Sequence, residues 1–135
     1  MKTLRRDIHA HPELAFEEKR TSDLVARTLE AAGIEVYRGI ADTGLVGVLR
    51  NGDGPSIGLR ADMDALPILE AGGADHKSTH DGVMHACGHD GHTAMLLGAA
   101  ETLAASRAFK GNVYFIFQPA EENKGGGRVM VEEGL

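Results

Sequence analysis

A run of five apolar residues, Val113 to Phe117, constrains the fold of this chain more than any other feature. Turn-forming residues flank the run, which is typical of a central strand that is buried on both faces. The segment before it, Ala94 to Ala105, places apolar and small residues at helical spacing. Another strand, Ser56 to Ala61, is expected ahead of that helix. A strand, a crossover helix and a second strand predict a parallel pair in an α/β layer fold.

The other segments alternate between helical and extended patterns. A helix is expected from Glu17 to Ala32, because apolar residues recur along one face and Gly33 can end it. The link from Asn51 to Pro55 is dense in turn residues and predicts a hairpin between its flanking strands. The remaining expectations are a short segment at Leu4–His11, strands at Ile34–Tyr37 and Leu45–Arg50, a polar loop at Glu70–Asp81 and the start of a helix at Arg128–Glu133.

A cluster of metal-binding residue types occupies eleven positions with the sequence V-M-H-A-C-G-H-D-G-H-T. Thiolate, imidazole and carboxylate groups bind borderline-soft divalent ions such as zinc. Helical sequence follows the cluster directly, so we predict half of a metal site on a loop at a helix N-terminus. The residues of these types are the only cysteine of the chain, Cys87, together with His85, His89, Asp90 and His92.

Other interpretations of this segment stay open from its residues alone. A histidine-rich loop can be merely solvated, and a lone cysteine is often a small buried hydrophobe. The Cys-x-His spacing also differs from the C-x2-C pattern of structural zinc fingers. Alternatively, Cys87 could be a nucleophile, which requires a thiolate of low pKa beside a histidine base.

Two pairs of carboxylates follow the predicted strands. Asp62 and Asp64 come after the strand that ends at Ala61, and Glu121 and Glu122 come after the apolar run. Ligand sites in open α/β sheets gather at the carboxyl ends of the strands. One carboxylate there can bind a metal while its neighbour serves as general base. Either pair is also compatible with a turn or a solvated acidic loop.

Charge and cysteine content exclude several classes of function. The chain has 135 residues and a formal net charge of −6, and it lacks the basic stripe that a nucleic-acid partner would require. No long apolar run or signal-like segment occurs, so no membrane partner is expected. One cysteine excludes an internal disulfide and is typical of a reducing compartment, so we expect a cytoplasmic protein.

Four motifs resemble the amidohydrolase branch of the aminoacylase/carboxypeptidase-G-like metallopeptidases. They are R-R-D-I-H-A-H-P-E-L from Arg5, R-A-D-M-D-A-L-P from Arg60, M-H-A-C-G-H-D-G-H-T from Met84 and Q-P-A-E-E from Gln118. That branch includes hippurate hydrolases, hydrolases of indole-acetyl-amino-acid conjugates and N-acetyl-diaminopimelate deacetylases. The resemblance implies a three-layer α/β sandwich with a mixed, largely parallel sheet. Residues 1–135 would form the N-terminal portion of a zinc-peptidase-like catalytic domain.

The resemblance also implies roles for individual residues. Cys87, His89 and Glu122 match metal ligands, and Glu121 matches the general base that activates a shared water. In other branches a ligand histidine occupies the position of Asp62. The residues expected to orient the ligands without binding the ions are Asp62, Asp64, Asp90 and His92.

The implied cofactors are two divalent metal ions, zinc or manganese, with cobalt or nickel as further possibilities. The implied reaction cleaves the amide bond of an N-acyl amino acid, a small-molecule substrate, to a carboxylic acid and a free amino acid. Family members carry two further histidine ligands and a smaller ferredoxin-like dimerisation domain, which implies that the parent protein is a homodimer.

Because residues 1–135 supply only part of that ligand set, we expect an incomplete catalytic domain that binds metal weakly and has no amidase turnover by itself. Three alternatives remain. The first is a non-catalytic metal-binding or regulatory module, and the second is a hydrolase that uses Cys87 as nucleophile. The third is a dipeptidase- or aminopeptidase-type relative.

Overall fold

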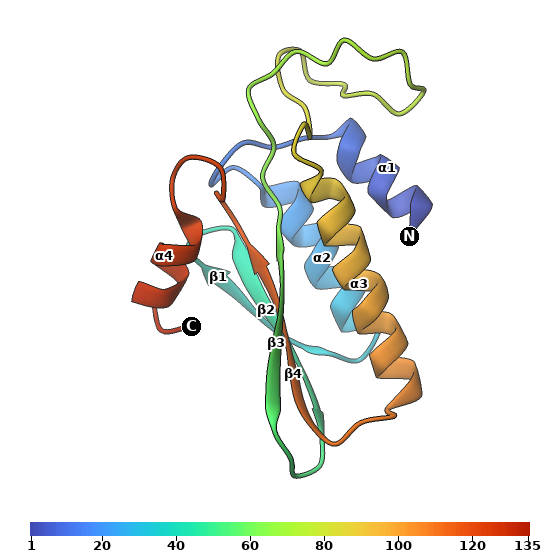
Figure 1. The fold of residues 1–135 in the computed structure, drawn as a ribbon, viewed down its shortest axis with the longest axis vertical. Helices are drawn as coiled ribbons and strands as arrows, with labels where there is room; N and C mark the ends of the chain where they lie inside the picture. Colours follow the sequence, from blue (N-terminus) through green and yellow to red (C-terminus); the bar gives the residue numbers. More distant parts are fainter.

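A mixed four-stranded sheet forms the centre of the computed structural model, which describes residues 1–135. Figure 1 shows α1, α2 and α3 on one side of this sheet and α4 on the other, so the predicted α/β fold with three layers is present. The strands are β1 (Glu35–Ile40), β2 (Gly44–Asn51), β3 (Ser56–Asp62) and β4 (Gly111–Gln118), and the helices are α1 (Lys2–Ala10), α2 (Lys19–Ala31), α3 (His89–Ser106) and α4 (Gly126–Glu132).

The strand order is β1-β2-β4-β3, which places the apolar strand β4 inside the sheet. β3 and β4 are parallel and α3 connects them, as the strand–helix–strand pattern predicts. The β1–β2 and β2–β4 pairs are antiparallel, so "largely parallel" does not describe these four strands. The short turn between β1 and β2 explains the first antiparallel pair, because a parallel pair needs a long crossover connection.

The hairpin predicted around Asn51–Pro55 is wrong. These residues do turn the chain, but β4 lies between β2 and β3, so the two strands that they join do not pair. The backbone N–H of Asn112 donates to the carbonyl oxygen of Pro55 at 3.0 Å and fixes the start of β4 beside this link. The central position gives β4 a partner on each edge, which suits the strand with the largest apolar side chains.

The main core lies between the sheet and the helices α2 and α3. Phe115 and Phe117 of β4 are fully buried there and pack with apolar side chains of β2, α2 and α3. Burying a side chain of this size stabilises the fold by roughly 1.5–3 kcal/mol. On the opposite face of β4, Tyr114 and Ile116 are only half-buried. The expectation that both faces of β4 are buried therefore holds for one face.

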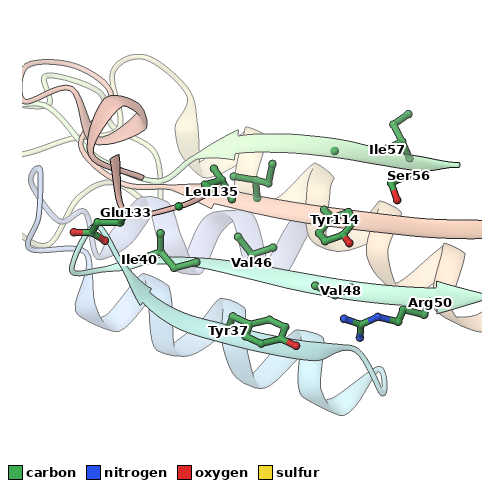
Figure 2. A pocket seen from close by; sticks show the side chains of 13 residues that line it. Tyr37, Ile40, Val46, Val48, Arg50, Ser56, Ile57, Tyr114, Glu133 and Leu135 are labelled. Atoms are coloured by element: carbon green, nitrogen blue, oxygen red, sulfur yellow. The ribbon is translucent and has the colours of Figure 1, made fainter. Parts of the chain in front are cut away.

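The second face of the sheet carries a shallow apolar groove beyond the reach of α4. Figure 2 shows that side chains of all four strands line this groove, among them Tyr37, Val48 and Tyr114, with Leu135 at one end. Its volume is about 520 Å³. None of the candidate site residues lies in it. No helix of the chain combines the length and the apolar character that crossing a membrane requires.

Candidate metal centre

The candidate site lies where β3, β4 and α3 meet. β3 and β4 are parallel and their last residues, Asp62 and Gln118, are paired, so the segments that follow both strands begin side by side. α3 begins next to them at His89, and its N-cap residue Gly88 has a left-handed conformation with φ of 89°. The predicted metal loop is therefore divided, because Cys87 precedes the helix while the residues after Gly88 form its first turn.

Three of the predicted metal ligands converge at this point. Donor atoms of Cys87, His89 and Glu122 all lie within 4.8 Å of one another. Nδ1 of the buried His89 donates to the backbone oxygen of Asp64 at 2.8 Å. A carbonyl oxygen can only accept, so the proton lies on Nδ1 and leaves Nε2 available for a cation, 3.7 Å from Oε1 of Glu122. This set of sulfur, nitrogen and oxygen donors fits a divalent ion of the zinc type.

Asp64 links two of these ligands. Its Oδ1 lies 3.2 Å from Nδ1 of His89, and its Oδ2 accepts the backbone N–H of Glu122 at 3.0 Å. Burial acts to raise the pKa of Asp64, but the hydrogen bonds from His89 and Glu122 outweigh it and hold the pKa below its usual value. The carboxylate is therefore ionised at neutral pH and can fix the orientation of both neighbours, as we expected for a supporting residue.

A second group of possible donors shares His89. Asp62, His89 and His92 also offer atoms within 4.8 Å of one another. Oδ1 of Asp62 lies 2.7 Å from Nδ1 of His92 and 3.5 Å from Nε2 of His89. One ring nitrogen binds one ion, so Nε2 of His89 cannot serve both groups at once. We expected Asp62 and His92 only to orient the ligands, whereas the geometry also permits direct contact of both with an ion.

The pKa of the Cys87 thiol distinguishes a metal ligand from a nucleophile. A hydrogen bond with Glu122, followed by burial and by nearby carboxylates, raises the pKa of the Cys87 thiol to about 11. A thiol with that pKa is a poor nucleophile at neutral pH but becomes a thiolate when a divalent ion displaces its proton. Burial acts to lower the pKa of His89, yet the bond to Asp64 and the charges of Asp62 and Asp64 raise it overall.

Glu121 lies beside these donors without belonging to either group. Its side chain is exposed, whereas the residues on either side, Ala120 and Glu122, are buried and half-buried. An exposed carboxylate next to a ligand can reach a water or a substrate above the site. This position suits the predicted general base.

Asp90 faces away from the donor groups and joins a separate polar cluster. Its Oδ2 contacts Nε of Arg5 at 3.1 Å and Nδ1 of His9 at 2.9 Å, while the other ring nitrogen of His9 lies 3.2 Å from Glu70. Asp90 thereby connects the first turn of α3 to α1 and to the loop after β3. The position of His9 between the carboxylates of Asp90 and Glu70 could not be predicted from the sequence.

His85 belongs to the predicted metal-binding cluster by residue type but to neither donor group, because it is 4% exposed and neither of its ring nitrogens has a hydrogen-bonding partner. Its place within the histidine-rich segment was the only indication of a ligand role. Burial lowers the pKa of His85 to about 4, so the ring is neutral under ordinary conditions.

Comparison with known protein families shows which family this chain belongs to. The model of peptidase family M20/M25/M40 matches residues 58–135, which include the Cys/His segment and both strand-end carboxylate pairs, Asp62/Asp64 and Glu121/Glu122. The chain belongs to peptidase family M20/M25/M40.

Individual members of the M20/M25/M40 family match nearly the whole chain. Hippurate hydrolase of Campylobacter jejuni is 53% identical over 133 residues, which cover 98% of this chain and 34% of that protein. IAA-amino acid hydrolase ILR1-like 2 of Arabidopsis thaliana is 51% identical over 135 residues, covering 99% of this chain and 31% of that protein. The chain thus spans about a third of the length of the curated relatives that it matches.

A solved M20 structure has the same fold over these residues. The Bacillus subtilis YXEP protein, described as a dinuclear metal binding peptidase from the M20 family, superimposes with a TM-score of 0.94 and 47% sequence identity. The match covers 98% of this chain and 38% of that one. The M20 catalytic fold and the resemblance drawn from the four sequence motifs are therefore confirmed.

Proposed function

We propose that this chain supplies metal ligands and the general base of a metal-dependent amidohydrolase that cleaves N-acyl amino acids. The observation that supports this most directly is the free Nε2 of His89, held in place by Asp64 beside Cys87 and Glu122. Two named relatives, a hippurate hydrolase and an IAA-amino acid hydrolase, suggest the substrate class of an acyl group joined by an amide to an amino acid.

The donor set defines which ions the site would hold. Cys87, His89 and Glu122 would bind one divalent ion, and the dinuclear description of the YXEP protein supports a second ion nearby. Zinc fits the mixed sulfur, nitrogen and oxygen donors directly, cobalt or nickel would also be accepted, and manganese would be held mainly by the carboxylate oxygens. A bound divalent ion supplies a Lewis acid that polarises the amide carbonyl and lowers the pKa of water.

Glu121 would carry the proton during hydrolysis. Its carboxylate accepts a proton from the attacking water as the new carbon–oxygen bond forms. The protonated Glu121 then donates to the amine nitrogen as the carbon–nitrogen bond breaks. The products are a carboxylic acid and a free amino acid. Asp64 keeps His89 and the backbone of Glu122 in position throughout.

The proposal can be tested by exchange with the Campylobacter jejuni relative. The chimera replaces the matching third of that hippurate hydrolase by residues 1–135 of this chain, and we expect it to hydrolyse hippurate when manganese or zinc is present. Glu121→Gln in the chimera should reduce kcat by about 10²–10⁴-fold, the range for loss of a general base, without loss of bound metal. Glu101→Gln, at an exposed position of α3, is the matched control and should leave kcat unchanged.

Two results would contradict the proposal. If the Glu121→Gln chimera keeps its turnover, Glu121 is not the base. If a chelator removes the metal from the chimera without loss of activity, the site is not a metal-dependent hydrolase. A non-catalytic metal-binding module predicts a chimera that binds metal and has no turnover at all.

A further inference from the structure

The link between α1 and α2 carries a buried carboxylate, Glu18, that belongs to neither donor group of the site. Glu18 is fully buried, and its neighbours are hydrogen-bonding groups without a cation among them. Its Oε1 accepts the backbone N–H of Ala120 at 2.8 Å, and its Oε2 accepts the hydroxyl of Thr43 at 2.5 Å. One side chain therefore joins the start of α2, the turn before β2 and the segment that follows β4.

Ala120 immediately precedes the two glutamates of the site and has an unfavourable backbone conformation. Its φ of 51° lies in the left-handed region, which residues with a Cβ atom rarely adopt. Such a conformation persists only where surrounding contacts hold it. The N–H of Ala120 is held by Glu18, and its carbonyl oxygen accepts the N–H of Gly126 at 2.9 Å.

Two buried carboxylates thus hold the backbone on either side of Glu121. Glu18 binds the N–H of the residue before it, and Asp64 binds the N–H of Glu122 after it. The same link makes a further contact beyond the glutamates, because the Lys124 ammonium lies 5.9 Å above the ring of Phe16 and donates to the oxygen of Ala15 at 3.3 Å. Residues 15–18 therefore contact this segment on both sides of the paired glutamates.

We propose that Glu18 is a positioning residue that sets the direction of Glu121 and Glu122 through the backbone of Ala120. The proposal rests on the proposed function, in which Glu122 is a metal ligand and Glu121 the base. Burial raises the pKa of Glu18, which means that the surroundings of this side chain disfavour its ionised form. The required property is an acceptor oxygen at this distance from Ala120, and the charge itself is dispensable.

Variants of Glu18 can separate the need for an acceptor oxygen from the need for a negative charge. Glu18→Gln keeps an acceptor oxygen for Ala120, and its amide can donate to the hydroxyl of Thr43. Glu18→Asp keeps the charge but shortens the side chain by one methylene, so it cannot reach Ala120 and Thr43 together. Thr43→Ala is the matched control, because it removes the other partner of Glu18 and leaves the bond to Ala120.

Cobalt(II) titration of the chain 1–135 measures the effect, because thiolate coordination by Cys87 gives a charge-transfer absorption. We expect Glu18→Asp and Glu18→Ala to weaken cobalt affinity by about tenfold or more, the usual range for loss of a supporting contact. Glu18→Gln should stay within about threefold of the wild type, and Thr43→Ala should bind normally despite lower stability. Hydrogen exchange of the Ala120 amide should accelerate in Glu18→Asp while the amides of β4 keep their protection.

The outcomes separate failure of this inference from failure of the proposed function. If the wild type shows no cobalt–thiolate absorption even when cobalt is titrated far beyond the protein concentration, as weak binding requires, the metal centre itself is refuted. If the wild type binds cobalt and Glu18→Asp binds it equally well, Glu18 does not position the glutamates. Equal weakening by Thr43→Ala and Glu18→Asp would also overturn the proposal, because it would show a general effect of stability. Should Glu18→Ala not fold, Glu18→Asp and the exchange rate at Ala120 still decide the matter.

Discussion

His85 illustrates how one buried ring can give the fold a pH dependence. The pKa of His85 is lowered from 6.5 to about 4 by burial, so the folded state disfavours the protonated ring. The unfolded state binds the proton more readily than the folded state. The stability that the neutral, buried His85 ring allows is therefore fully present above pH 6.5, and it is lost as the pH falls towards 4. At about 1.4 kcal/mol per pKa unit, the loss approaches about 3 kcal/mol.

We therefore predict that His85→Leu removes a large part of the acid sensitivity. Urea unfolding at pH 7 and pH 4.5 should show that the wild type loses about 2–3 kcal/mol more than the variant between these conditions. At pH 7 the variant should be as stable as the wild type or more so, because neither ring nitrogen of His85 has a partner to lose. His80→Leu, at an exposed position, should keep the wild-type pH dependence. An unchanged pH dependence in His85→Leu would contradict this assignment.

Cys87 and His89 predict the pH dependence of metal affinity. The pKa of Cys87 is raised to about 11, so the thiol must release a proton before it can bind an ion, and the raised pKa of His89 adds competition from protons as the pH falls. Affinity should therefore increase by about tenfold per pH unit between pH 7 and 9, where the thiol dominates. Competition with a chromophoric chelator measures it. Cys87→Ser should bind more weakly and with a flatter slope, whereas a wild-type affinity independent of pH would exclude the thiol as ligand.

Individual residues differ in how far the sequence could assign them. Residue type and position relative to predicted strands indicated only the Cys/His cluster and the carboxylate pairs. The resemblance of the four motifs to a metallopeptidase family selected Cys87, His89 and Glu122, and the structure brings these three together. Glu18 could not be chosen, because its partner Ala120 is 102 positions away and bonds through a backbone group that every residue has. Supporting contacts of this kind depend on tertiary structure alone.

Among the secondary-structure elements, those with a strong local sequence pattern were predicted correctly, whereas the pairing of β2 with the distant β4 was not. Helix α2 and strand β4 were predicted close to their observed bounds, because each has a strong periodic or continuous apolar pattern. The false hairpin at Asn51–Pro55 arose because turn residues specify a reversal of the chain but not the strand that fills the space beside it. β4 pairs with both β2 and β3, which lie more than 40 residues earlier in the chain, so turn residues between β2 and β3 carry no information about it.

The beginning of α4 provides a test of how tightly the glutamate segment is held. A Cβ atom at Gly126 would lie 1.9 Å from the carbonyl oxygen of Pro119, whereas one at Gly127 would meet only the flexible end of Gln118. We expect Gly126→Ala to destabilise the fold by about 1–3 kcal/mol and to weaken metal binding, since the backbone before Glu121 must move. Gly127→Ala should change stability by less than about 1 kcal/mol. Thermal unfolding and cobalt titration measure both effects, and equal behaviour of the two variants would contradict the steric argument.

At the scale of the whole molecule, the two faces of the sheet differ in how well they are covered. α2 and α3 bury most of one face, and the donor groups gather at the end of that layer, where β3 and β4 finish. α4 covers only part of the other face, where Met130 packs on Val46 and Val48. The site and the open groove of Figure 2 are therefore separate features, and chemistry at one does not depend on access to the other.

The open face predicts self-association of the chain. Tyr37 at the groove is 46% exposed, and the groove continues from it over the apolar side chains of Val46, Val48 and Tyr114. Contiguous exposed apolar surface of this kind favours association, because contact with a second copy removes it from water. We expect sedimentation velocity to show a concentration-dependent increase in mass for the wild type, and Tyr37→Lys to reduce it by placing a charge on the open face of the sheet, where Tyr37 lies beside Val46. Met95→Lys, at a position 66% exposed on α3 and thus on the other side of the sheet, should associate like the wild type. Equal association of both variants would show that another surface is responsible, because only one of the two lysines lies where the proposed contact would bury it.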